Sequence, residues 1–124
     1  MTSIPKSLEA ILAADWKADA DLASLRVIAT ERSLDRIGGP TAQLRQTGIG
    51  RCPEAPLSHR NVRVLLTIIS PHEDMDKAGT QLEGFVTAAL DYLDTRFQHE
   101  DATQVAYNDR LAYDIPLIIT ASKE

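Results

Sequence analysis

The stretch NVRVLLTIISPHEDMDKAGTQLEGFVTAALDYLD, residues 61–94, decides the fold of this chain. Residues 62–69 are nearly all β-branched or aliphatic, which suits a buried strand, and the run is too short to span a membrane. From Leu82 onward apolar residues recur with the 3.6-residue spacing of one helix face, at Phe85, Val86, Ala89, Leu90 and Leu93. The stretch therefore predicts a central strand with an amphipathic helix packed on it.

Two capping signals compete for the start of this helix. Ser70 with Glu73, and Thr80 with Glu83, both have the spacing of a capping box. The pattern predicts a helix over 76–94 and leaves open whether the earlier turn belongs to it.

The remaining periodic segments are short. They are a helix over 7–15, strands over 25–30 and 41–47, and a hairpin made by 104–107 with 111–120. Pro116 lacks an N–H, which places the last strand at a sheet edge or turns this position away from a partner strand. Together these elements predict a single α+β domain over 1–124, a mostly antiparallel sheet with two helices packed on one face.

The least regular part of the chain is the long loop predicted at about 47–59. Glycines and prolines interrupt both helix and strand patterns there, and Arg45, Arg51 and Arg60 surround it. Two interpretations stay open. The loop is either a basic arm that reaches a neighbouring molecule or a plain hairpin connection.

Charge is distributed unevenly along the 124 residues, whose net charge is −5. Residues 1–63 hold nine Lys and Arg and seven Asp and Glu, whereas residues 64–124 hold four and eleven. The two halves are therefore +2 and −7. If they map to different faces, copies can pack head to tail, which is the contact that closes into rings. The alternative is an uneven solvated surface.

His72, Glu73, Asp74 and Asp76 form the one dense set of potential metal ligands in the sequence. They match neither the EF-hand spacing nor HExxH, and acidic residues at a helix start interact favourably with the helix dipole. We therefore favour the helix-start interpretation over a metal site.

No catalytic motif is present either. The single cysteine, Cys52, indicates no internal disulfide, and the acidic, aromatic-poor composition argues against sequence-specific DNA binding. The N-terminus does not match a secretory signal, and no run reaches the length of a transmembrane helix. We expect a protein without catalytic residues, cofactor, metal or membrane contact.

Five segments carry a family resemblance: LASLRVIATE, TAQLRQTGI, HRNVRVLLTIISPHE, DKAGTQLEGFVTAALDYLD and RLAYDIPLIIT. In the order of the predicted elements and in their residue pattern, they resemble the tail terminator proteins of long-tailed bacteriophages, especially those infecting actinobacteria. The likeness covers almost the whole chain.

The resemblance implies a small α+β subunit of a hexameric ring that caps the tail tube and ends its polymerisation. Its partners would be the major tail protein and a head-tail connector or stopper protein, with genomic DNA passing through the ring without sequence-specific binding. The protein would be made in the host cytoplasm and reside in the virion, and the segment 48–59 would contact the tube.

Two other functions stay open: a neighbouring neck protein, which joins head to tail or acts as a stopper, and a metal-dependent enzyme that uses the acidic turn. On any structural role we expect contacts from the loop, the acidic turn and the last strand. The expected interaction residues are Arg45, Arg51, Arg60, His72, Glu73, Asp74, Asp76, Asp114 and Pro116.

Overall fold

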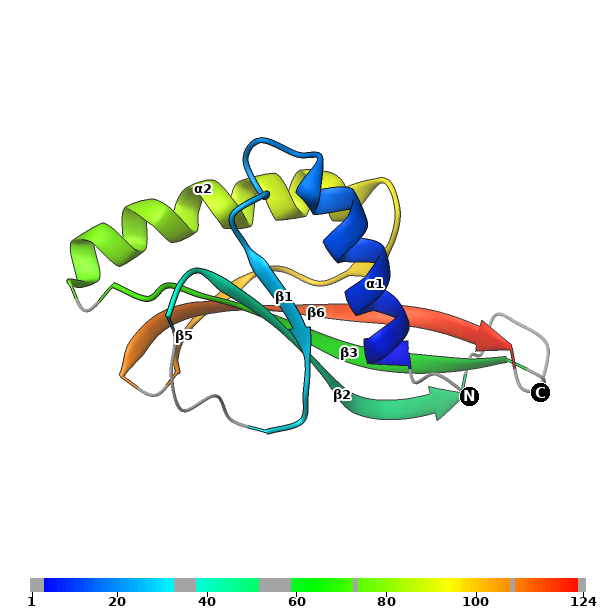
Figure 1. Ribbon diagram of the computed structural model, residues 1–124. Coiled ribbons are helices and arrows are strands. Elements are labelled where there is room, and N and C mark those ends of the chain that lie inside the picture. The colour runs from blue at the N-terminus through cyan, green and yellow to red at the C-terminus, as the bar shows by residue number, and fades with distance from the viewer. Residues whose placement is uncertain (1–3, 33–37, 52–58, 73, 108, 123–124) are drawn as a thin grey trace.

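The computed structural model describes residues 4–32, 38–51, 59–72, 74–107 and 109–122, with the backbone alone at 51, 59, 121 and 122 (Figure 1). In chain order the elements are α1 (Ile4–Lys17), β1 (Arg26–Ala29), β2 (Thr41–Arg51), β3 (His59–Ile69), α2 (Met75–Asp94), β4 (Gln98–His99), β5 (Thr103–Tyr107) and β6 (Arg110–Ser122).

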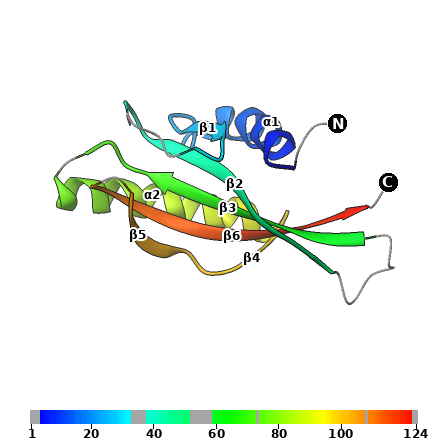
Figure 2. The same cartoon turned by 90° about the horizontal axis from the view of Figure 1, so that it is seen from below.

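All six strands belong to one sheet. Its strand order is β1-β2-β3-β6-β4, and β5 also pairs with β6. The β1–β2 pair is parallel and every other pair is antiparallel. Both helices lie on the same side of this sheet, with α2 along β3 and β6 and α1 beside β1 and β2 (Figures 1 and 2). The predicted α+β architecture is confirmed.

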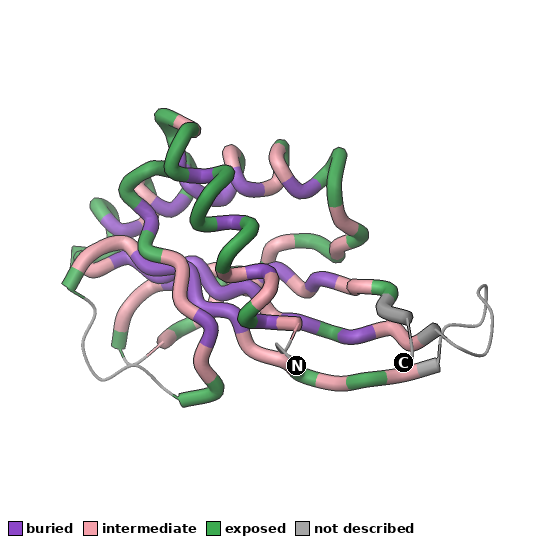
Figure 3. The backbone as a smooth tube through the Cα atoms, turned by 45° about the vertical axis from the view of Figure 1, so that its right-hand side comes forward, coloured by how far each residue is buried: buried purple, intermediate pink, exposed green. Residues whose placement is uncertain are grey.

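The core lies between the sheet and the helix layer. Leu66 of β3 pairs with Leu44 of β2 on one side and Ile115 of β6 on the other, and all three side chains are fully buried. Burying a side chain of this size contributes about 1.5–3 kcal/mol. The helices also touch each other, because the ring of Trp16 meets that of Tyr92 edge-on at 5.8 Å. Buried positions accordingly run through both layers (Figure 3).

Helix α2 begins at Met75, one residue before the predicted start. Its N-cap is Asp74, so neither Ser70 nor Thr80 caps it as the sequence patterns predicted. Thr80 lies inside the helix, where its hydroxyl donates to the carbonyl oxygen of Asp76 at 3.1 Å. Asp74 caps the helix because its carboxylate accepts hydrogen bonds from two N–H groups of the first turn, which have no partner within the helix.

The predicted loop at 47–59 is wrong at both of its ends. Strand β2 continues through Gly48 and Gly50 to Arg51, with a bulge at Thr47, and His59 already belongs to β3. Neither glycine has a positive φ, so both adopt ordinary extended backbone. The long ladder to β3 offsets the low strand propensity of glycine. Residues 52–58 lie outside the described part of the chain.

The prediction that the last strand lies at a sheet edge is also wrong. β6 pairs with β3 along nearly its whole length and with β4 and β5 on its other side. Pro116 is accommodated because its carbonyl accepts from the Glu100 N–H at 2.9 Å, on the β4 side. The N and C=O of one residue point to the same side of an antiparallel strand, so the missing donor faces away from β3. The other prediction for Pro116, that its position turns away from a partner strand, holds for β3.

Candidate interaction surface

The strands β2, β3 and β6 run out past the helix layer as a three-stranded ribbon (Figures 1 and 2). We define the ribbon as residues 45–51, 60–65 and 116–121, which are paired in register. At its inner end Arg45 pairs with Leu65, which pairs with Pro116. Residues 47–51 of the segment that was expected to be an irregular arm are thus ordered strand, as is His59.

The three arginines predicted to flank the loop all lie on the ribbon. Arg51 is the direct cross-strand partner of Arg60, while Arg45 is six residues away along β2, or about 20 Å. The Nε atom of Arg45 is buried and has no hydrogen-bond partner. The ribbon is therefore a basic surface, although its arginines do not converge on one point.

Sequence reasoning missed a fourth ribbon arginine, Arg63. A Cβ atom added at Gly48 would lie 3.8 Å from its Nη1, and one at Gly50 would lie 3.9 Å from its Nη2. The guanidinium therefore lies over these two glycines, on the sheet face away from the helices. No local pattern predicts this contact, because it depends on the register set by the bulge at Thr47.

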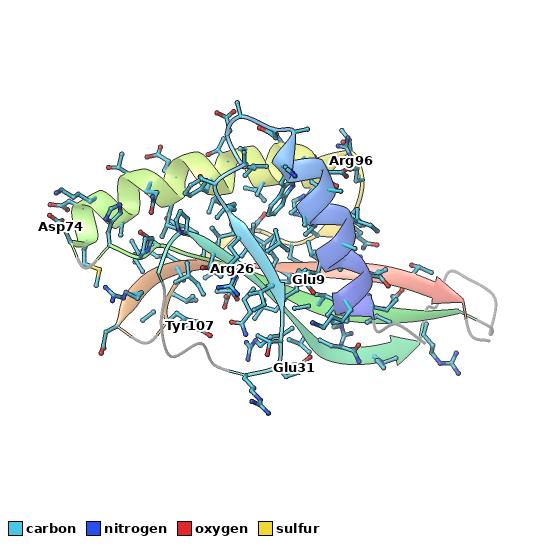
Figure 4. The ribbon with its side chains drawn as sticks, viewed as in Figure 1. Glu9, Arg26, Glu31, Asp74, Arg96 and Tyr107 are labelled. Carbon is cyan, nitrogen blue, oxygen red and sulfur yellow. The ribbon has the colours of Figure 1, made fainter. Side chains whose placement is uncertain are left out.

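The acidic turn lies far from the ribbon, at the other end of β3 (Figure 4). Asp74 is engaged as a helix cap, since its Oδ1 accepts from the N–H groups of Asp76 and Lys77 at 2.9 and 3.4 Å. His72 is exposed, and Glu73 lies outside the described residues. The structure does not bring the basic and acidic groups together, and it gives Asp74 a structural role.

Asp114 lies on the sheet face away from the helices, within a row of polar residues. Its Oδ1 accepts from the Thr67 hydroxyl at 2.7 Å, and Thr67 pairs in register with Gln43 of β2. Gln43 is itself buried and donates to the carbonyl oxygens of Thr30 and Arg32 at 3.0 and 2.8 Å. The row thus joins β3 to β6 and β2 to the segment after β1. The expected contact role of Asp114 and Pro116 stays a prediction.

Charge is segregated between the sheet and helix α2. The strands β1, β2, β3 and β6 carry six arginines and one aspartate: Arg26, Arg45, Arg51, Arg60, Arg63, Arg110 and Asp114. Helix α2 carries four carboxylates against one lysine: Asp76, Glu83, Asp91, Asp94 and Lys77. The uneven charge seen along the sequence thus maps onto different parts of the molecule, a basic sheet and an acidic helix.

A hollow of about 630 Å³ opens between the two helices, and most of the charged residues that line it are acidic. Its charged and aromatic residues are Asp15, Asp19, Asp21, Asp91, Tyr92 and Arg96. The Tyr92 hydroxyl donates to the Asp15 carboxylate, and Arg96 lies 4.3 Å above the Tyr92 ring. Burial, and then Asp15, raise the pKa of Tyr92 to about 12. These contacts join the ends of the two helices.

His99 connects α2 to the sheet. Its Nε2 lies 2.7 Å from Oδ1 of Asp94, and its Nδ1 lies 2.9 Å from the carbonyl oxygen of Glu100. Only the protonated ring donates from both nitrogens. The Glu100 carbonyl first, and then Asp94 and Asp101, raise the pKa of His99, while burial opposes them. The sequence alone did not predict this contact, because the Asp94–His99 pair, five residues apart, depends on the turn that connects α2 to β4.

Within the described ranges, no three His, Cys, Asp or Glu side chains lie close enough to bind a metal ion together. No helix of the described chain is long and apolar enough to cross a membrane. No protein-family model matches the chain, and a search of curated proteins finds no match.

Proposed function

We propose that the protein is a tail terminator, a ring-forming structural subunit that caps the tail tube of a long-tailed bacteriophage. It ends tube polymerisation and provides the surface to which the head attaches. The observation that carries the proposal is the segregation of charge between a basic sheet and the acidic helix α2. A subunit built this way presents unlike surfaces to its neighbours, which favours head-to-tail packing over two-fold packing.

The family resemblance supplies the partners. They are further copies of the chain in a hexameric ring, the major tail protein, and a connector or stopper protein on the head side. Genomic DNA passes through the ring without sequence-specific contacts. The protein is made in the host cytoplasm and is carried in the virion at the head-tail interface.

The proposal includes no catalysis, cofactor or metal. Asp74, the central residue of the acidic turn, already accepts two backbone hydrogen bonds as the cap of α2. A carboxylate held by backbone donors is a poor candidate for a ligand or a general base. We therefore do not propose a metal-dependent enzyme.

Mixing the purified protein with isolated tail tubes and, separately, with DNA-filled capsids tests the proposal. We expect co-sedimentation with the tubes and ring-shaped density at one tube end by electron microscopy. A protein that binds capsids first and ignores free tubes is a neck protein, and this result overturns the terminator assignment. A protein that stays monomeric with both particles overturns the structural role as a whole.

A further inference from the structure

We propose that neighbouring copies of this chain join edge to edge, with the outer side of β2 in one copy pairing with the outer side of β6 in the next. The ribbons then form one continuous sheet around the assembly. This inference rests on the proposed ring and names the residues that form its contacts.

The outer side of β2 is open along most of its length. β1 pairs with residues 41–44 alone, and from 45 to 51 no described strand lies on that side. The Gln46 N–H instead donates to Oε1 of Glu31 at 3.0 Å, where a partner strand would offer a carbonyl. A hollow of about 520 Å³ opens here, lined by Pro5, Lys6, Ala29, Thr30, Glu31 and Gln46. There is room for another strand beyond the end of β1.

The composition of this edge favours pairing. Natural edge strands are commonly protected by lysine or proline, and the segment 46–50, QTGIG, contains neither and carries no charge. Ile49 is 61% exposed. Gly48 and Gly50 have no Cβ, which lets a second backbone approach closely.

The outer side of β6 is open at the same end of the molecule. β4 pairs with Leu117 and Ile118, and beyond them residues 119–122, ITAS, have no strand neighbour on that side within the described chain. Because β3 lies between β2 and β6, the two open edges are on opposite sides of one ribbon. Residues 45–51 of β2 and residues 119–122 of β6 are therefore available to pair.

Charge selects β2 with β6 over β2 with β2. Near the β2 edge lie Lys6, Arg32, Arg45 and Arg51, against Glu9 and Glu31. The open stretch of β6, residues 119–122, carries no charge, and Glu100 lies farther in along β6, where its N–H donates to the carbonyl oxygen of Pro116. A two-fold β2 contact would bring arginines together, whereas a head-to-tail contact places the basic side of β2 beside an uncharged strand. Strands β2 and β6 are both antiparallel to β3, so they run parallel to each other. The pair formed by β2 of one copy and β6 of the next is therefore a parallel pair.

Disulfide trapping tests the contact. We would introduce Gly50→Cys and Thr120→Cys together, with Cys52→Ser to remove the native thiol. Gly50 and Thr120 both pair with Asn61, so within one chain they are two strand spacings apart, about 10 Å, beyond disulfide reach. A Cβ at Gly50 meets nothing nearer than 3.9 Å, so the substitution is tolerated. Oxidation should give a reducible ladder that ends at one closed species.

The single-cysteine variants are the matched controls. Each alone should stay uncrosslinked, and an equal mixture of the two should give dimers and nothing larger. Dimers from Gly50→Cys alone would show two-fold β2 pairing and overturn the proposal. A ladder without an end would show an open filament, which contradicts closure but keeps the edge contact.

A charged side chain on the edge gives a second test. Ile49→Lys should weaken self-association about tenfold or more, since lysine protects edges from pairing. Ile11→Lys, an equivalent change at an exposed helix position, should leave association unchanged. If the double-cysteine protein caps tubes as a ring but never crosslinks, the edge contact is wrong and the function stands. If it crosslinks into closed rings that ignore tubes, the contact stands and the function is wrong.

Discussion

Glu31 accepts a hydrogen bond from the backbone N–H of Gln46 at 3.0 Å, at the point where β1 has ended beside β2. A side-chain carboxylate thus occupies the place of a strand carbonyl at the start of an open edge. This hydrogen bond bears on the proposed assembly, because a strand added to β2 has to displace Glu31 first.

Glu31→Ala should free this edge. The Gln46 N–H then bonds to water, so the monomer should lose no more than about 0.5 kcal/mol of unfolding free energy. Self-association should strengthen, because a competing acceptor is gone. Hydrogen exchange of the Gln46 amide, which should become faster, and sedimentation measure the two effects. Glu31→Gln keeps an acceptor oxygen and should resemble the wild type; weaker association of Glu31→Ala would contradict the account.

Asp74→Ala should destabilise the protein by about 1 kcal/mol, because two N–H groups of the first turn of α2 lose their acceptor. Chemical denaturation measures the loss. Asp74→Asn keeps an acceptor at the same position and should recover most of it. If Asn is as damaging as Ala, the capping interpretation is wrong.

Leu12→Ala should cost about 2–5 kcal/mol, because Leu12 is fully buried between α1 and the sheet. The adjacent Ile11 is 46% exposed, and Ile11→Ala should change stability by less than about 0.5 kcal/mol. Urea unfolding of the two variants compares them directly. Similar losses would mean that α1 packs through a different face.

Stability should depend on pH through His99. Its pKa in the folded protein is raised above the ordinary value of about 6.5. The stabilisation is therefore fully present below about pH 6.5 and is lost as the pH rises through the raised pKa. The loss should stay under about 1 kcal/mol, since the Asp94 side chain is 60% exposed. Urea unfolding from about pH 5.5 to 8.5 measures it, and His99→Gln should abolish this part of the dependence; an unchanged pH profile in that variant would rule the residue out.

Charge reversal at Arg51 should weaken assembly while the monomer stays folded. Position 51 is the last residue of β2, so Arg51→Glu should leave the ladder to β3 in place. Association should weaken, because the basic side of the ribbon loses a cation, and reversal at Arg45 or Arg60 should weaken it too. Lys77→Glu, at the far end of α2, is the control. Intact association of all three ribbon variants by sedimentation would contradict the basic-arm interpretation.

The sequence predicted the elements whose patterns are local. The alternation in β6 and the 3.6-residue spacing in α2 each lie within one segment, and both are confirmed. It did not predict the length of β2 or the interior place of β6. Both depend on partner strands far along the chain: the ladder to β3 carries β2 through Gly48 and Gly50, and β4, only two residues long, covers part of β6.

The same limit applies to the candidate surface. The clustering of Arg45, Arg51 and Arg60 near one segment is visible in the sequence, and the ribbon does carry all three. The roles of Arg63 and Glu31 were not visible, because each lies next to residues that are 13 to 15 positions away in the sequence. The sequence placed Asp74 at the start of the helix. It did not predict that Asp74 is the cap, because the backbone turn after β3 decides which polar residue caps α2.

The central claim is that this chain caps tail tubes, and tube length is its most direct measure. A major tail-tube protein of a long-tailed bacteriophage would be polymerised with and without the purified chain, and tube lengths would be measured by electron microscopy. The account predicts shorter tubes as the chain is added, each with ring-shaped density at one end. Unchanged lengths and bare tube ends, at concentrations where the chain is folded, would contradict it.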